Sequence, residues 1–234
     1  MNVWTGAMVG WMALWGGLLG LVLARWVQLA PIWMHRRWAD NPQDTPAAPD
    51  WSWTWSAFMT LSTAALWGAC AWIWTEPAAL AWAVFGSGLW LLACIDARSG
   101  WLPDVFTLGL LGLGLLASTT PFHSTNGHEA IWGALWGYGI LWTAAWGFRT
   151  LTGREGLGGG DPKLLGAIGA WMGWSAVAPV LLLASVMGAL VGSLMQASGR
   201  WPRNAAFAFG PFLAAAAPLV GLWGNHPFGV FLQV

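Results

Sequence analysis

The chain has 234 residues, of which 57% are hydrophobic and only 8% are charged, with nine basic and nine acidic residues. An ordinary soluble domain carries roughly 25% charged residues, so this composition excludes a soluble fold and indicates a membrane protein. The nine Lys and Arg residues are scattered, which excludes a nucleic-acid-binding protein because such proteins need a basic stripe.

Hydrophobic stretches of near-spanning length recur along the chain. The first, residues 3–24, lacks a basic leading region and is longer than a signal-peptide core, so we expect a retained anchor. Six further stretches, each long enough to cross a bilayer, lie at 53–74, 78–95, 104–121, 131–148, 176–196 and 207–223. An eighth stretch, 164–174, is too short to cross alone in standard geometry, so we expect a short or half-inserted helix there.

The distribution of Lys and Arg predicts an orientation. If the amino terminus faces outward and 164–174 counts as a crossing, all nine basic residues fall on the cytoplasmic side, as the positive-inside rule requires. We therefore expect an all-α polytopic membrane helical bundle with about eight crossings and both termini on the non-cytoplasmic side. Residues 1–234 would form a single membrane domain, with a shortened cytoplasmic loop at 25–52.

Two cysteines, Cys70 and Cys94, each lie inside an apolar stretch. Two residues cannot build a disulfide framework or a four-cysteine zinc site, so we interpret both as small core residues and predict no metal.

Two loops bring acidic side chains to helix ends on the expected cytoplasmic face. The loop "CIDARSGWLPD" contains Asp96 and Asp104, and the loop "GREGLGGGDPK" contains Glu155 and Asp161. Ionisable groups at a membrane boundary are costly to desolvate and usually mark a functional path or a paired site. We expect Glu155 to be solvated, and the other three carboxylates are candidates for a site.

Local structural roles compete with this interpretation. Asp161 is well placed to cap a helix, Asp104 is better explained as an N-cap than as a catalyst, and Asp96 could end a helix beside Arg98. Capping by Asp161 does not explain why three glycines stand at 158–160, because glycines do not favour the start of a helix. They do allow unusual backbone angles and a close approach of other groups to the backbone.

Two carboxylates on facing helix ends can perform chemistry that neither performs alone. Held a few ångströms apart, they cannot both ionise easily, so one keeps a proton while the other acts as a base toward a shared water. The water attacks a peptide carbonyl, and the protonated carboxyl donates to the developing oxyanion. The pair Asp96 and Asp161 therefore predicts an aspartic protease that requires no metal and no nucleophilic side chain.

Two other functions fit parts of the same pattern. A small polytopic transporter or channel also uses membrane carboxylates, but its acids should lie near the bilayer midplane, whereas these are expected at one face. A scaffold protein descended from a peptidase would be free to lose Asp96 and Asp161, and both are present.

Three segments carry a resemblance to a known family. "GLGGGDPKLLGAIGAWMGW" resembles the second catalytic motif of type IV prepilin peptidases, which are bacterial members of the Gly-x-Gly-Asp aspartyl protease class. "CIDARSGWLPDVFTL" resembles their first motif, and "FAFGPFLA" is similar to a later Pro-Phe-Gly-Pro segment. The similarity covers about residues 78–223, which we expect to be the peptidase core.

The resemblance implies a role for individual residues. Asp96 and Asp161 match the two catalytic aspartates; the motif and substrate-proximal positions are Gly158, Gly160, Lys163 and Asp104. It implies an endopeptidase of the bacterial inner membrane that removes the short basic leader of prepilins or pseudopilins at the cytoplasmic face. Its expected partners are this substrate and the lipid bilayer, and the peptidase activity needs no cofactor.

The chain departs from the family's pattern near its amino terminus. The family usually carries a cytoplasmic insertion with two Cys-x-x-Cys pairs, which this sequence lacks, so the chain resembles a short form without the zinc site. Full-length relatives also methylate the new amino terminus of the cleaved pilin. The missing insertion weakens the transfer of that activity, and S-adenosylmethionine is expected only if the methyltransferase is retained.

Overall fold

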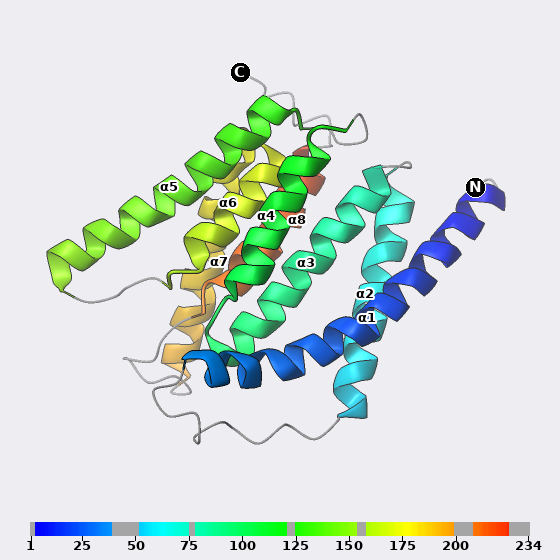
Figure 1. The fold of residues 1–234 in the computed structure, drawn as a ribbon, viewed down its shortest axis with the longest axis horizontal. Helices are drawn as coiled ribbons and strands as arrows, with labels where there is room; N and C mark the ends of the chain where they lie inside the picture. Colours follow the sequence, from blue (N-terminus) through cyan, green and yellow to red (C-terminus); the bar gives the residue numbers. More distant parts are fainter. Residues whose placement is uncertain are drawn as a thin grey trace. The chain divides into compact units, whose positions relative to one another are not determined.

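A computed structural model of the chain describes residues 3–38, 52–74, 78–120, 125–153, 158–198 and 208–224. Every regular element in these ranges is an α-helix, as the hydrophobic pattern predicts (Figure 1). In chain order the helices are α1 (Val3–Trp38), α2 (Trp53–Ile73), α3 (Ala78–Ser99), α4 (Asp104–Ala117), α5 (Gly127–Thr152), α6 (Asp161–Met172), α7 (Trp174–Ala197) and α8 (Gly210–Gly224).

The chain divides into two compact units, Met1–Leu91 and Leu92–Val234. Helix α3 crosses the boundary, so its last two turns belong to the second unit. Both loops with candidate acidic residues lie in the second unit, and this unit contains most of the expected peptidase core.

In the first unit, α1 packs against α2 through glycines. A Cβ atom on Gly20 would lie 2.7 Å from the backbone oxygen of Met59, and one on Gly16 would lie 2.7 Å from the Cβ atom of Trp67. Only a residue without a side chain allows this approach, which is how small residues bring membrane helices together.

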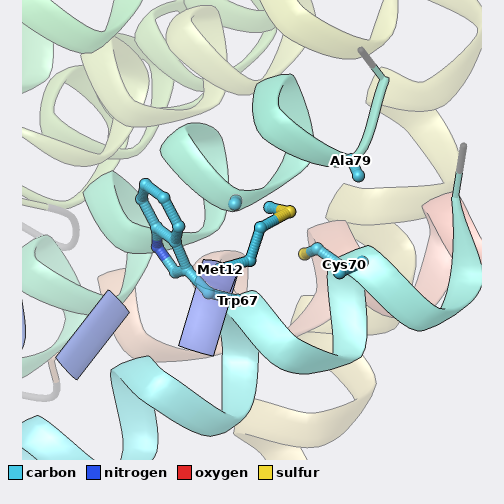
Figure 2. Close-up of a cluster of buried hydrophobic side chains, with 6 residues drawn as sticks. Met12, Trp67, Cys70 and Ala79 are labelled. Carbon is cyan, nitrogen blue, oxygen red and sulfur yellow. The ribbon is translucent and has the colours of Figure 1, made fainter. Parts of the chain in front are cut away.

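Buried side chains extend this contact into a small core. Met12, Trp67, Cys70 and Ala79 are among its members, and Figure 2 shows Met12 between Trp67 and Cys70. The indole nitrogen Nε1 of Trp67 donates to the hydroxyl of Ser87 at 2.8 Å, so the polar atom of this buried ring has a partner. Cys70 is a free, buried thiol, as expected of a small core residue.

Helix α1 runs well beyond the expected boundary at residue 24, so the predicted loop 25–52 begins inside a helix. Arg25 ends the apolar run but lies on an exposed face, and one exposed charge does not stop a helix. The buried positions Ala24, Val27 and Ala30 continue the inward face at helical spacing.

In the second unit, α6 is the central element, because ten of its twelve residues are buried. It packs against α4, α5, α7 and α8, and α5 lies along it in Figure 1. Gly133 and Gly137 on α5 face Gly169 and Leu165 on α6, so the two helices touch through their backbones. Gly173, with a φ of 83°, ends α6 and separates it from α7, as the expected short helix before the next apolar stretch requires.

Among the described residues, four helices are long and apolar enough to cross a membrane. They include Gly6–Ala30 of α1 together with α2, α3 and α7, and the shorter helices α4 and α8 are also apolar. The structure thus has the helical, apolar character of an integral membrane protein.

Candidate active site

Asp96 lies in the last turn of α3 and is 4% exposed. Its Oδ2 atom accepts a hydrogen bond of 3.0 Å from the backbone N–H of Gly210, the first residue of α8. A side chain that merely ended α3 would face water, so this buried carboxylate requires a different explanation from helix termination.

Asp161 is the first residue of α6 and is 5% exposed. The N-cap position belongs to Gly160, so Asp161 does not cap the helix, contrary to the simplest local interpretation. Its carboxylate accepts a hydrogen bond from the backbone of Gly158. This bond connects Asp161 to residues 158–160, three consecutive glycines that we call the glycine loop.

The two carboxylates influence each other electrostatically. Asp161 precedes the apolar stretch 164–174, and the pKa of its carboxyl is raised to about 7, chiefly by burial. The neighbouring charge of Asp96 also contributes to this rise in pKa, whereas the hydrogen bond from Gly158 opposes it. The structure thus brings together two buried acids that are 65 residues apart in the sequence and that repel each other when both are ionised.

Leu102 connects the loops that carry these acids. A Cβ atom on Gly160 would lie 2.5 Å from the Cβ atom of Leu102, and one on Gly210 would lie 3.3 Å from its Cδ1 atom. Gly160 itself has φ −84° and ψ −29°, which any residue can adopt. The glycine is therefore needed for close approach, and not for an unusual backbone angle at this position.

Lys163 and Asp104 join the starts of α6 and α4. The Nζ atom of Lys163 donates to Oδ1 of Asp104 at 2.6 Å, and the two side chains are 28% and 56% exposed. The expectation that Asp104 caps α4 is wrong, because Pro103 holds the N-cap position and Asp104 is the first helical residue. Its carboxylate instead pairs with a lysine across the helix interface.

The register between α5 and α6 gives the level of Asp161 along the helices. Gly133 faces Gly169 and Gly137 faces Leu165, so the helices are antiparallel, and extending this spacing by one turn brings Leu141 opposite Asp161. Helix α5 then continues for eleven more residues to Thr152, which is roughly 16 Å at 1.5 Å per residue. Helix α5 therefore extends beyond the start of α6, and Asp161 does not lie level with the carboxyl-terminal end of α5.

The sequence motifs indicate Asp96, Asp161, Gly158 and Gly160, but they give no role to Leu102 or Gly210. Leu102 lies between Asp96 and Asp104 in the first loop, and Gly210 lies in the quoted segment "FAFGPFLA". A glycine directly before a proline at a helix start was the available signal for Gly210. Glu155, expected to be solvated, lies outside the described residues.

Within the described ranges, no three His, Cys, Asp or Glu side chains are grouped so that they could hold a metal ion. Two buried carboxylates with backbone hydrogen bonds are suited to proton transfer with a water molecule between them. The arrangement can supply a base and an acid at one place without a nucleophilic side chain.

Comparison with known proteins agrees with this chemistry. Residues 83–193 match the Type IV leader peptidase family, and this range contains both aspartates, the glycine loop and Lys163. No solved structure matches the chain significantly.

Curated relatives carry the name "Prepilin leader peptidase/N-methyltransferase". The Pseudomonas aeruginosa protein is 38% identical over 177 residues, covering 74% of this chain and 60% of the relative. The Stutzerimonas stutzeri protein is 37% identical over 62% of this chain, and the Burkholderia pseudomallei protein is 42% identical over 67%; each match covers 50% of the relative. The chain spans about half the length of the curated relatives that it matches. Residues 83–193 of this chain thus carry its similarity to the type IV leader peptidase family.

Proposed function

We propose that this chain is a membrane aspartyl endopeptidase that removes the short basic leader of type IV prepilins or pseudopilins. The observation that carries the proposal is the pair of buried, electrostatically coupled carboxylates of Asp96 and Asp161 inside the matched family range. Buried acids are costly to desolvate, and proton-transfer catalysis is the role that explains two of them together.

In the proposed reaction, the aspartate pair shares one proton. The ionised carboxylate takes a proton from a water molecule, and the resulting hydroxide attacks the scissile carbonyl carbon. The protonated carboxyl donates to the developing oxyanion and stabilises the tetrahedral intermediate. The carboxyl that took the proton from water then gives it to the leaving amine as the C–N bond breaks, and a hydroxyl of the collapsing intermediate returns its proton to the other carboxylate, so the pair is again singly protonated.

The other motif residues have supporting roles in this proposal. Gly158 orients Asp161 through its backbone, and Gly160 lets Leu102 approach the glycine loop. The ion pair between Lys163 and Asp104 holds the starts of α6 and α4 together beside the substrate. All four residues would act on the position of the aspartates or of the substrate, and not on the bond that breaks.

We place this site on the cytoplasmic side of a bacterial inner membrane, in a core of residues 78–223. Supporting this, the last turn of α3 and the first residues of α6 and α8 meet around the aspartates. With α4 joined through Lys163, these helix ends belong to one side of the second unit. The nine basic residues then favour eight crossings, an outward amino terminus and a cytoplasmic segment within 25–52.

The relatives are named for two activities, a leader peptidase and an N-methyltransferase. Our proposal includes the methyltransferase as a possible second activity of this chain. Methylation of the new amino terminus would consume S-adenosylmethionine as a second substrate. The proposed peptidase reaction does not need S-adenosylmethionine, because it uses only the chain's own carboxylates and water.

Mass spectrometry of a candidate pilin from cells with and without this chain tests the proposal. We expect the pilin to lose its leader only when the chain is present, and the same spectrum reports whether its amino terminus is methylated. A pilin that is already mature in the absence of the chain would show that another enzyme does the work.

A further inference from the structure

The hydrogen bond between Gly210 and Asp96 joins two segments that are 114 residues apart, the end of α3 and the start of α8. Its acceptor, Oδ2 of Asp96, is buried, so water does not compete for the carboxylate on that side. A backbone donor at a helix start is rigid, because the helix that follows fixes its direction. The bond therefore restricts the rotation of the Asp96 carboxylate.

Gly210 cannot be replaced without moving this carboxylate. A Cβ atom there would lie 3.1 Å from Cγ and 2.6 Å from Oδ2 of Asp96, and real Cβ atoms essentially never come as close as the second distance to another heavy atom. The backbone of Gly210 is not in the left-handed region, since the positive-φ glycines of the described ranges are Gly100, Gly153 and Gly173. An alanine is thus allowed by the backbone, and its closest clash would be with the aspartate.

The same contact extends to the second loop of the site. Leu102 lies against Gly210 through its Cδ1 atom and against Gly160 through its Cβ atom. Gly160 directly precedes Asp161, so a displacement at Gly210 reaches both carboxylates through one side chain. Because Leu102 is in close contact with both Gly160 and Gly210, its side chain has little space into which it could move.

We propose that Gly210 is a positioning residue of the peptidase: its backbone N–H and its missing side chain hold the Asp96 carboxylate in the orientation that faces the shared water. This inference rests on the proposed function, because it assigns Asp96 a partner in that reaction. In this role Gly210 acts through the position of Asp96 and takes no part in the bond that breaks.

Activity of Gly210→Ala is the first test. Misplacing a catalytic group slightly can lower the rate strongly, so we expect kcat for prepilin cleavage to fall at least about tenfold with KM within about twofold. Gly109→Ala and Gly112→Ala are matched controls on α4, because nothing lies within 4 Å of a Cβ atom at either position. We expect both controls to keep the wild-type kcat, and a wild-type kcat in Gly210→Ala would overturn the proposal.

A double-mutant cycle on thermal unfolding tests the contact without any activity. Gly210→Ala should lower the melting temperature by several degrees in the wild type but by much less in Asp96→Ala, which lacks the clashing oxygen. If Gly210→Ala alone does not accumulate, the double variant should accumulate at the level of Asp96→Ala. An equal loss in both backgrounds, or no recovery in the double variant, would show that Gly210 does not act through Asp96.

The two readouts also separate this inference from the proposed function. A wild-type chain that fails to cleave prepilin would contradict the peptidase, whereas the melting-temperature cycle would still report the contact. A chain that cleaves prepilin but shows no coupling between positions 96 and 210 would contradict only the role of Gly210.

Discussion

Leu102 packs against Gly160 so closely that a Cβ atom on the glycine would lie 2.5 Å from the Cβ atom of the leucine. The contact joins the loop after Asp96 to the loop before Asp161, so it helps to set the separation of the two acids. The glycine motif contributes here through the absence of a side chain, at an ordinary α-helical backbone angle.

Gly160→Ala should therefore destabilise the protein and reduce activity. Overpacking a close contact costs about 1–3 kcal/mol, and Leu102 can yield only by moving its backbone because the clash is at its Cβ atom. Gly159→Ala is a matched control in the same loop, since a Cβ atom there meets nothing within 4 Å. Thermal unfolding of the two variants measures the difference, and equal melting temperatures would contradict this packing.

Removal of the ion pair between Lys163 and Asp104 should have a small effect on stability. Both side chains are partly exposed, so solvent screening limits the coupling between them to about 0.2–1 kcal/mol. A double-mutant cycle with Lys163→Met and Asp104→Asn measures this coupling, which should decrease as the salt concentration rises. A coupling of several kcal/mol that is independent of salt would argue against a screened surface pair.

The close approach of α5 to α6 predicts opposite outcomes for two glycines of α5. A side chain at Gly133 would overlap the backbone of Gly169, so Gly133→Ala should strongly lower the melting temperature. Gly139 has nothing within 4 Å of a Cβ atom, so Gly139→Ala should leave stability unchanged or raise it through helix propensity. If Gly139→Ala were the more damaging variant, the α5–α6 register would be wrong.

Stability should depend on pH through Asp161. Its pKa of about 7 in the folded protein lies above the ordinary value of 3.8, so the folded state binds the proton more tightly than the unfolded state. The stabilisation by this proton is fully present below about pH 4 and is lost as the pH rises through about 7. Asp161→Asn has no proton to lose at this position. The melting temperature of the variant minus that of the wild type should therefore increase from pH 4 to pH 8. A difference that is constant over this range would contradict a buried, protonated Asp161.

The helices could be predicted well from the sequence because apolar runs and polar breaks follow the spanning length. The expected stretch 131–148 lies inside α5, and 104–121 begins with α4 at the same residue. Helix α1 was predicted too short because Arg25 interrupts the apolar run, whereas the buried face of the helix continues past it. A single residue on an exposed face changes the composition of a run without changing its periodicity.

The site was less predictable, because its contacts depend on segments that meet only in the folded chain. Asp96 and Asp161 were identifiable as unusual acids, but the Lys163 partner of Asp104 was not, since local pattern favoured a cap. Gly210 is 114 residues from the carboxylate that it contacts, and sequence alone gives no sign of that pairing.

The most direct measurement of the central claim compares prepilin cleavage by the wild type with cleavage by Asp96→Asn and Asp161→Asn. Glu129→Gln is the control, because it removes an acid at the amino-terminal end of α5, away from the level of Asp161. We predict that each asparagine variant stays in the membrane and leaves the leader uncut, while Glu129→Gln cleaves like the wild type. Leader removal by either asparagine variant would contradict the aspartate pair.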